Sequence, residues 1–276
     1  MSSMKVLITS GCSLSDTMDY DRTDNEPWKN LKVWPIWVEE HFKPEVAIHS
    51  GLGSTGNDLI SKKAIYHCTQ QLKKHNAEDI CLVVAWSRID RNAKLVEKSS
   101  LLGNVFYNER NKQLSERPEK KNHTWVYQFS DYSNNVNEND TAWVYFNVWK
   151  YIKEVDYYYG YFQEHINMME NTLWNMLAVK SFCELHNIKY VWTTIDDSYM
   201  EEQHIHKHWS ISHLYDSIKT CKGRMLQCSM AKYIKDTANN TDIQYVQNDG
   251  VHLGTLGHKM ISEDIIIPYI AHYETN

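Results

Sequence analysis

The sequence predicts an α/β protein, a three-layer α/β/α sandwich around a parallel sheet of about five strands. Two observations carry this prediction. Short apolar runs alternate with longer segments of helical periodicity along most of the 276 residues. The runs over residues 6–8 and 80–85 are apolar at every position, which is typical of strands covered on both faces. In such sheets ligands bind beyond the carboxyl ends of the strands, so we expect the site there.

The first third of the chain is expected to form three strands and two helices. Gly11 ends the first apolar run and permits a tight turn, which places Ser13 in the loop that follows the strand. Residues 16–30 are polar and acidic and are interpreted as a surface loop. Three glycines within residues 51–56 indicate backbone that turns sharply or closely approaches another group. The expected strands span residues 4–10, 45–49 and 79–86, and the expected helices span 34–41 and 57–76.

Residues 88–159 interrupt the alternation of strands and helices. They contain a charged stretch, an Asn-rich stretch and a stretch dense in aromatic residues. A structureless loop of that length is improbable in a compact domain, so we expect an insertion with structure of its own. The chain is therefore predicted to be a single domain over residues 1–276, with residues 93–160 inserted as a lid or substrate-binding subdomain.

The strand and helix pattern resumes after the insertion. A helix is expected first, then a strand, and then a His-rich segment over residues 196–213. A second helix, a short last strand and a closing helix complete the chain. The expected helices span residues 161–186, 225–237 and 255–273, and the expected strands span 188–195 and 243–246.

Composition excludes several classes of function. The net charge of −6 provides no basic footprint for nucleic acid, so no nucleic-acid partner is expected. No apolar run approaches the ~18 residues of a membrane span, and the N-terminus lacks a signal-peptide pattern. Six scattered cysteines without a CxxC pair favour free thiols in the cytoplasm or another reducing compartment. The chain contains ten Trp and 18 Tyr. These residues could stack on a ligand or could form a Tyr- and Trp-rich core, and composition favours neither interpretation.

Two distant motifs predict a catalytic site. Ser13 follows the first strand, and Asp249 precedes His252 by three residues in a Gly-rich turn near the end of the chain. An alcohol is a poor nucleophile until a neighbouring base removes its proton, and a carboxylate can orient an imidazole for that role. A parallel topology brings both motifs to one edge of the sheet. The pattern therefore predicts Ser13 as nucleophile, His252 as general base and Asp249 as its orienting partner.

These motifs resemble the SGNH/GDSL hydrolase superfamily, over residues 4–92 and 161–273. The segment Gly11-Cys12-Ser13-Leu14-Ser15 is similar to the family's Gly-Asp-Ser-Leu-Ser element, with Cys in place of Asp, and Asp249 with His252 matches the C-terminal pair. The resemblance implies a flavodoxin-like SGNH hydrolase fold, a catalytic triad and no metal or other cofactor. It also implies an oxyanion hole whose donors include the amide of Ser13.

The other oxyanion donors depart from the family pattern. The glycine loop after the second strand places the donating amide at Gly53 or Ser54, of which we prefer Gly53. After the third strand the family has Gly-x-Asn-Asp, whereas this chain has Ser87 at the Asn position. Either Ser87 substitutes or Asn57 supplies the donor. Loss of one donor costs on the order of a hundredfold or more in rate, so this departure bears on activity.

Other side chains have two interpretations each. Cys12 is a second potential nucleophile or, as we prefer, a small buried residue. His204, His206 and His208, followed by His213, could ligate a metal, but a solvated segment is the preferred interpretation. His258 is expected to pack in or cap the closing helix.

The expected function is hydrolysis of a carboxylic ester through an acyl-serine intermediate. Arg88 and Arg91 follow the third strand at the expected site edge. They bind a substrate carboxylate or phosphate or, as the default interpretation, form local ion pairs. The aromatic insertion suggests a small-molecule or carbohydrate ester, for example an O-acetylated sugar. The alternatives are a catalytically impaired binding or structural protein and an acyltransferase with the same triad. The sequence leaves the oligomeric state unassigned.

Overall fold

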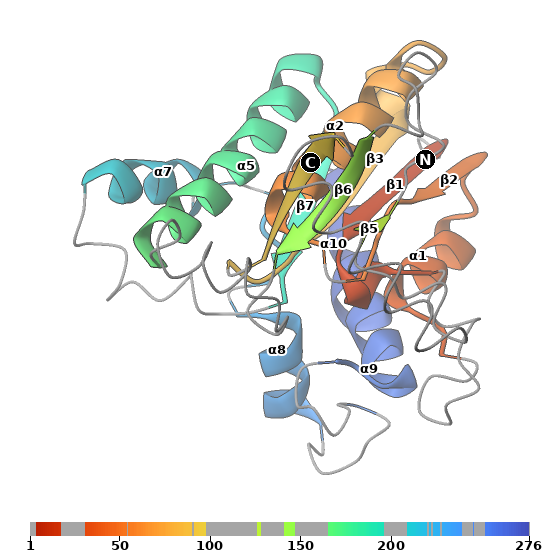
Figure 1. Cartoon of the computed structure of the whole chain (residues 1–276). Coiled ribbons are helices and arrows are strands. Elements are labelled where there is room, and N and C mark those ends of the chain that lie inside the picture. The colour runs from red at the N-terminus through yellow and green to blue at the C-terminus, as the bar shows by residue number, and fades with distance from the viewer. Residues whose placement is uncertain are drawn as a thin grey trace, which may run out of the picture.

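The structure is a computed structural model that describes residues 4–17, 31–53, 55–89, 91–97, 126–127, 141–146, 165–195, 209–219, 221, 223–226, 228–238, 245 and 252–275. Every structural statement below concerns these residues. Figure 1 shows a central sheet with helices around it.

The central sheet has four parallel strands in the order β2-β1-β3-β7. The strands are β1 (Val6–Gly11), β2 (Val46–His49), β3 (Ile80–Trp86) and β7 (Lys189–Thr194). Strands β1 and β3 are buried along their whole length, as their continuous apolar runs predict. Gly11 lies opposite Ala85 at the carboxyl ends of β1 and β3. The α/β class and the parallel sheet are thus confirmed, whereas a fifth strand stays a prediction.

Helices α1 (Trp34–Phe42) and α2 (Asn57–Leu72) reach opposite faces of the central sheet. Consecutive residues of a strand point to opposite faces. The Ser10 hydroxyl donates to the Ile60 carbonyl of α2 over 3.3 Å, whereas Thr9 bonds His49, which in turn bonds Glu39 of α1. The sheet is therefore a middle layer.

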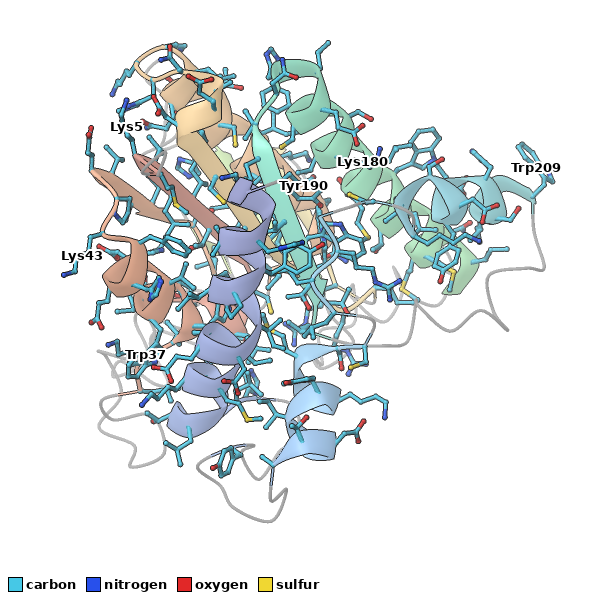
Figure 2. The ribbon with its side chains drawn as sticks, turned by 180° about the vertical axis from the view of Figure 1, so that it is seen from behind. Lys5, Trp37, Lys43, Lys180, Tyr190 and Trp209 are labelled. Atoms are coloured by element: carbon cyan, nitrogen blue, oxygen red, sulfur yellow. The ribbon has the colours of Figure 1, made fainter. Side chains whose placement is uncertain are left out.

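The remaining helices extend these two layers. Helix α5 (His165–His186) packs against α2, and α7 (Trp209–Lys219) packs against α5. The closing helix contacts α1 and passes in front of the sheet in Figure 2. It comprises α9 (Thr255–Met260), a π-helical turn (Ile261–Ile266) and α10 (Ile267–Thr275).

A second, antiparallel sheet lies within the stretch that interrupts the alternation. Its strand order is β4-β6-β5, with β4 (Asn92–Glu97), β5 (Val126–Tyr127) and β6 (Thr141–Phe146). Strands of this stretch therefore pair with one another and not with the parallel sheet, as far as the described residues show. The limits of the domain and of the insertion at 93–160 stay predictions.

Several element boundaries differ from those expected. Helix α2 ends at Leu72, and α8 (Met230–Thr237) begins five residues later than predicted. The reason is that Met225 is paired with β7: its N–H donates to the Trp192 carbonyl over 2.9 Å, so it continues the sheet edge. Most of the strand expected at 243–246 and most of the loop expected at 16–30 lie outside the described residues.

The core fills the space between the sheet and its helices. Three of its largest fully buried side chains are tryptophans, Trp34, Trp86 and Trp192. The indole N–H of Trp34 donates to the Ser15 hydroxyl over 3.2 Å, and that of Trp86 donates to the Tyr190 hydroxyl over 3.3 Å. The polar edges of Trp34 and Trp86 are thus satisfied inside the protein, and all three fully buried side chains serve the core. In the described part, no helix is both long and apolar enough to span a bilayer.

Candidate active site

Ser13 and His252 meet at the carboxyl edge of the parallel sheet. Ser13 opens a short 3₁₀ turn (Ser13–Ser15) directly after β1, and its Oγ lies 2.9 Å from Nε2 of His252. The two residues are 239 positions apart in the sequence. Both side chains are only partly buried, so the pair borders solvent. The sequence prediction that these motifs face each other agrees with this geometry.

The turn after β1 is packed closely against Gly11 and Trp34. A Cβ on Gly11 would lie 2.3 Å from the Ser15 Oγ, so only glycine fits there. The Ser15 N–H donates to the Cys12 carbonyl over 2.8 Å, and the Ser15 side chain is buried under Trp34. Cys12 is fully buried, with its sulfur 3.8 Å from the Ser13 Oγ, as the buried interpretation of this residue predicts. The turn thus exposes one hydroxyl, that of Ser13.

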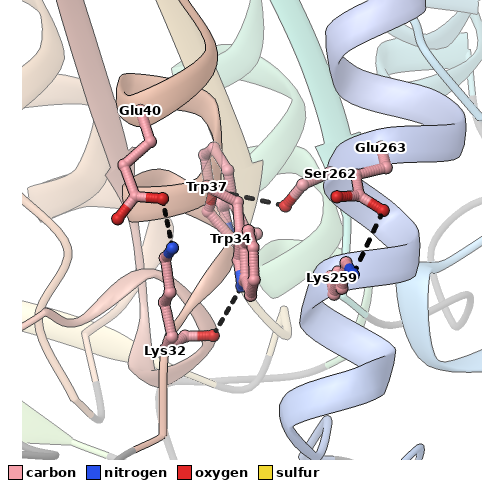
Figure 3. Close-up of polar contacts among 7 residues, drawn as sticks. All are labelled: Lys32, Trp34, Trp37, Glu40, Lys259, Ser262 and Glu263. Atoms are coloured by element: carbon pink, nitrogen blue, oxygen red, sulfur yellow. Dashed lines mark hydrogen bonds and ion pairs between the residues drawn. The ribbon is translucent and has the colours of Figure 1, made fainter.

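The loop that carries His252 is anchored through the closing helix. The Trp34 N–H donates to Nδ1 of His258 over 3.3 Å, and the Ser262 hydroxyl donates to the Trp34 carbonyl over 3.3 Å. Figure 3 shows this attachment of Trp34 to the closing helix beside the Lys259–Glu263 ion pair. Because Trp34 also holds Ser15, one buried indole residue connects the two halves of the site. Asp249 lies outside the described residues, so its role as orienting partner stays a prediction.

His258 is a neutral histidine inside the protein. Its side chain is fully buried, and Nδ1 accepts the Trp34 N–H, which leaves the proton on Nε2. Burial, together with the nearby His252, lowers the pKa of His258 to about 3. It therefore packs against α1 as expected, although its hydrogen bond goes to Trp34 and not to the end of its own helix.

The pKa of His258 predicts a loss of stability in mild acid. The unfolded chain binds a proton at His258 near pH 6.5, whereas the folded chain binds one only near pH 3. Stability is thus complete above pH 6.5 and falls as the pH approaches 3. Between pH 7 and 4.5 this residue alone is expected to cost about 2 kcal/mol. Urea unfolding at both pH values should show that loss in the wild type and a correspondingly smaller loss in His258→Gln; equal losses would contradict the assignment.

The glycine loop after β2 is fastened along β1 and the Ser13 turn. The N–H groups of Ser50 and Leu52 donate to the carbonyls of Thr9 and Gly11 over 2.8 and 3.1 Å. Gly51 is pressed so closely to the turn that a Cβ would lie 2.0 Å from the Ser15 carbonyl oxygen. The loop therefore has one position relative to the nucleophile.

The Gly53 amide, our preferred oxyanion donor, is engaged by a side chain. Its N–H donates to Oδ2 of Asp16 over 2.8 Å. In this arrangement it is not open to a substrate oxygen, which corrects the expectation for Gly53. The alternative donor, the amide of Ser54, lies outside the described residues.

Asn57 holds the end of β3 and does not face a substrate position. Its Nδ2 donates to the Ser87 carbonyl and to the Thr172 Oγ1, both over 3.1 Å, and its Oδ1 accepts the Ser87 N–H over 2.8 Å. Both donor hydrogens are used, so Asn57 is corrected from oxyanion donor to a clamp on Ser87. The buried Ser87 hydroxyl accepts from Nη1 of Arg91 over 3.4 Å. In that bond the Ser87 hydroxyl is the acceptor, so its own proton is the donor that this chain offers at the position of the family's Asn after β3.

Asp16 and Lys63 form a buried charged layer beneath the glycine loop, which the sequence analysis missed. Asp16 is 2% exposed and Lys63, on α2, is 7% exposed. Burial lowers the pKa of Lys63 to about 8 even though the Asp16 charge opposes that shift. One turn along α2, burial and the Lys63 charge lower the pKa of His67 to about 4. The available signal was a carboxylate three residues after the proposed nucleophile.

The remaining predicted residues fall in different places. Arg88 and Arg91 follow β3 and are partly buried. His213 lies exposed on α7, stacked on Trp209, whereas His204, His206 and His208 lie outside the described residues. Within the described part, no three His, Cys, Asp or Glu side chains are grouped to hold a metal ion.

No protein-family model matches the chain, and no curated protein matches it. Function must therefore be inferred from the geometry of the site.

Proposed function

We propose that the protein is a serine hydrolase that cleaves a carboxylic ester through an acyl-serine intermediate. The observation that supports this most is the 2.9 Å separation of the Ser13 Oγ and the His252 Nε2 at the carboxyl edge of the sheet. This distance is within reach for direct proton transfer, and both groups border solvent. The resemblance to SGNH/GDSL hydrolases in the residues around them points to the same chemistry.

In the proposed reaction His252 acts first as base and then as acid. As the Ser13 oxygen attacks the ester carbonyl, its proton passes to Nε2 of His252. That proton then goes to the leaving alcohol, and Ser13 keeps the acyl group. A water molecule then attacks the acyl-serine and gives a proton to His252. As the bond between the acyl carbon and the Ser13 oxygen breaks, His252 returns that proton to Ser13 and the acid leaves. Asp249 is proposed to hold the imidazole so that Nε2 faces the serine.

The proposed donors for the oxyanion lie in the loops that follow β1, β3 and β2 at the carboxyl edge of the parallel sheet. We propose the amide of Ser13 and the hydroxyl of Ser87, which occupies the position of the family's Asn. The third donor is the Ser54 amide, the alternative that the glycine loop offers. Preorganised donors of this kind supply about 3–4 kcal/mol each, so an incomplete set predicts a slow enzyme and not an inert one.

A panel of 4-nitrophenyl esters with acyl chains from acetyl to palmitoyl tests this function. Wild type should hydrolyse at least one ester with saturation, and Ser13→Ala should reduce its kcat by at least about a thousandfold. Ser217→Ala is a matched control, because that serine lies on α7 and bonds only within its helix, to the His213 carbonyl. Equal rates for wild type and Ser13→Ala would exclude the proposed mechanism.

A second candidate is a binding protein on a hydrolase scaffold. It is favoured by the engagement of two expected oxyanion donors, the Gly53 amide with Asp16 and the Asn57 amide with Ser87 and Thr172. The ester panel separates the candidates, since a binding protein would leave every ester intact while remaining folded.

A further inference from the structure

Arg91 is a partly buried cation without a counter-charge in the described structure. Its guanidinium makes one side-chain hydrogen bond, from Nη1 to the Ser87 Oγ at the long distance of 3.4 Å. Its Nε is fully buried and has no hydrogen-bond partner. No carboxylate of the described residues forms an ion pair with it. The local ion pair considered as its alternative role is therefore not seen there.

Two other partly buried cations of the described part, Arg224 and Lys180, have partners. Arg224 donates from Nε to the Leu226 carbonyl over 3.0 Å and stacks on Trp192. Lys180 pairs with Glu184 one turn along α5 at 2.7 Å. A guanidinium has five donor hydrogens, and leaving a buried charged donor unpaired is costly. The contrast indicates that Arg91 is arranged for an acceptor that is not part of this surface.

The position of Arg91 connects it to the proposed active site. Gly11 and Ala85 are register partners in the neighbouring strands β1 and β3. Ser13 lies two residues after Gly11, and Ser87 lies two residues after Ala85. The carboxyl ends of these strands therefore bring Ser87 to the same edge as Ser13. Since Arg91 contacts Ser87, its guanidinium stands beside the position of the proposed oxyanion donor.

The geometry points to an anion site: we propose that Arg91 binds an anionic group of the substrate, a carboxylate, sulfate or phosphate, so that the natural substrate is an anionic ester. The assignment of an anionic substrate deepens the proposed function and rests on it. The anion site itself does not depend on the proposed function. The planar fork of a guanidinium matches the paired oxygens of such groups, and Arg88 on the same short segment adds positive charge.

Anion binding is tested first, without any reaction. Titration of the folded protein with inorganic phosphate and with succinate, followed by calorimetry, should show saturable binding of at least one of them. Arg91→Gln should weaken it at least about tenfold and Arg91→Lys less, because lysine keeps the charge but loses the fork. Ser13→Ala and Lys180→Gln should bind as wild type does; Lys180→Gln removes the same charge from α5, where Lys180 (labelled in Figure 2) pairs with Glu184. Absence of binding in wild type, or equal binding in Arg91→Gln, overturns the site.

Substrate class is tested second, with esters that differ only in charge. One pair places the charge on the alcohol, 4-acetoxybenzoate and its methyl ester; the other places it on the acyl group, mono-4-nitrophenyl succinate and its methyl ester. In at least one pair, Arg91→Gln should lower the charged-to-neutral ratio of kcat/KM at least about tenfold. An unchanged ratio in both pairs overturns the substrate assignment. Anion binding that depends on Arg91 in a protein inactive on every ester would instead refute the hydrolase and leave the anion site standing.

Discussion

His252→Gln is expected to reduce kcat for ester hydrolysis by at least about a thousandfold while KM changes little. The Nε2 of His252 is the one base in contact with the Ser13 Oγ among the described residues, at 2.9 Å. Glutamine can still hydrogen-bond the serine but cannot accept its proton. Steady-state rates on the best ester of the panel, with active-site concentration fixed by protein mass, measure the effect.

A matched histidine controls for the loss of an imidazole elsewhere. His213 is exposed on α7, where its ring stacks on Trp209 and its Nδ1 bonds the Trp209 carbonyl. His213→Gln should retain wild-type kcat. A His252→Gln enzyme with more than about a tenth of wild-type kcat would show that another group removes the serine proton.

Asp16→Ala is expected to destabilise the fold by about 3 kcal/mol. The substitution removes the acceptor of the Gly53 N–H and leaves the Lys63 ammonium buried without the nearby carboxylate that favours its charge. A buried charge that loses its partner is among the most costly changes in a protein interior. Urea unfolding at pH 7 measures the loss, with the slope of the transition as a check on two-state behaviour.

Asp16→Asn separates the charge from the hydrogen bond. Its amide oxygen can still accept the Gly53 N–H, so stability should fall less than in Asp16→Ala, and the pKa of Lys63 should drop below about 8 once the opposing charge is gone. Double substitution with Lys63→Met should recover part of the stability lost by Asp16→Ala, because the unpaired ammonium is then absent. Simple additivity of the two losses would show that Asp16 and Lys63 do not interact.

The parallel scaffold was predictable because its signal is local. Strands β1 and β3 carry uninterrupted apolar runs, and burial on both faces requires them. Helix α7 was not predicted, because its polar residues and His213 obscured an apolar stripe that packs on α5. The start of α8 was placed too early because the pairing of Met225 with Trp192 is a tertiary contact without a local signal.

The contact between Ser13 and His252 was predictable, and the engagement of the proposed donors was not. Ser13 and His252 follow from residue type, spacing and the rule that parallel strands end at one edge. Which amide faces a substrate depends on the other groups that compete for it. The Gly53 N–H donates to the Asp16 carboxylate, and the Asn57 side-chain amide donates to the Ser87 carbonyl. Such competition is decided in three dimensions, so residue type alone did not show that the Gly53 and Asn57 groups are engaged.

Covalent labelling tests the nucleophile most directly. Folded protein treated with a fluorophosphonate should gain one adduct by intact mass, and peptide mapping should place it on Ser13. His252→Gln should label at least about a hundredfold more slowly, because the base within 2.9 Å of the Ser13 Oγ is gone. Absence of an adduct on Ser13 in folded wild-type protein, or equal labelling rates in the two proteins, would contradict the proposed hydrolase.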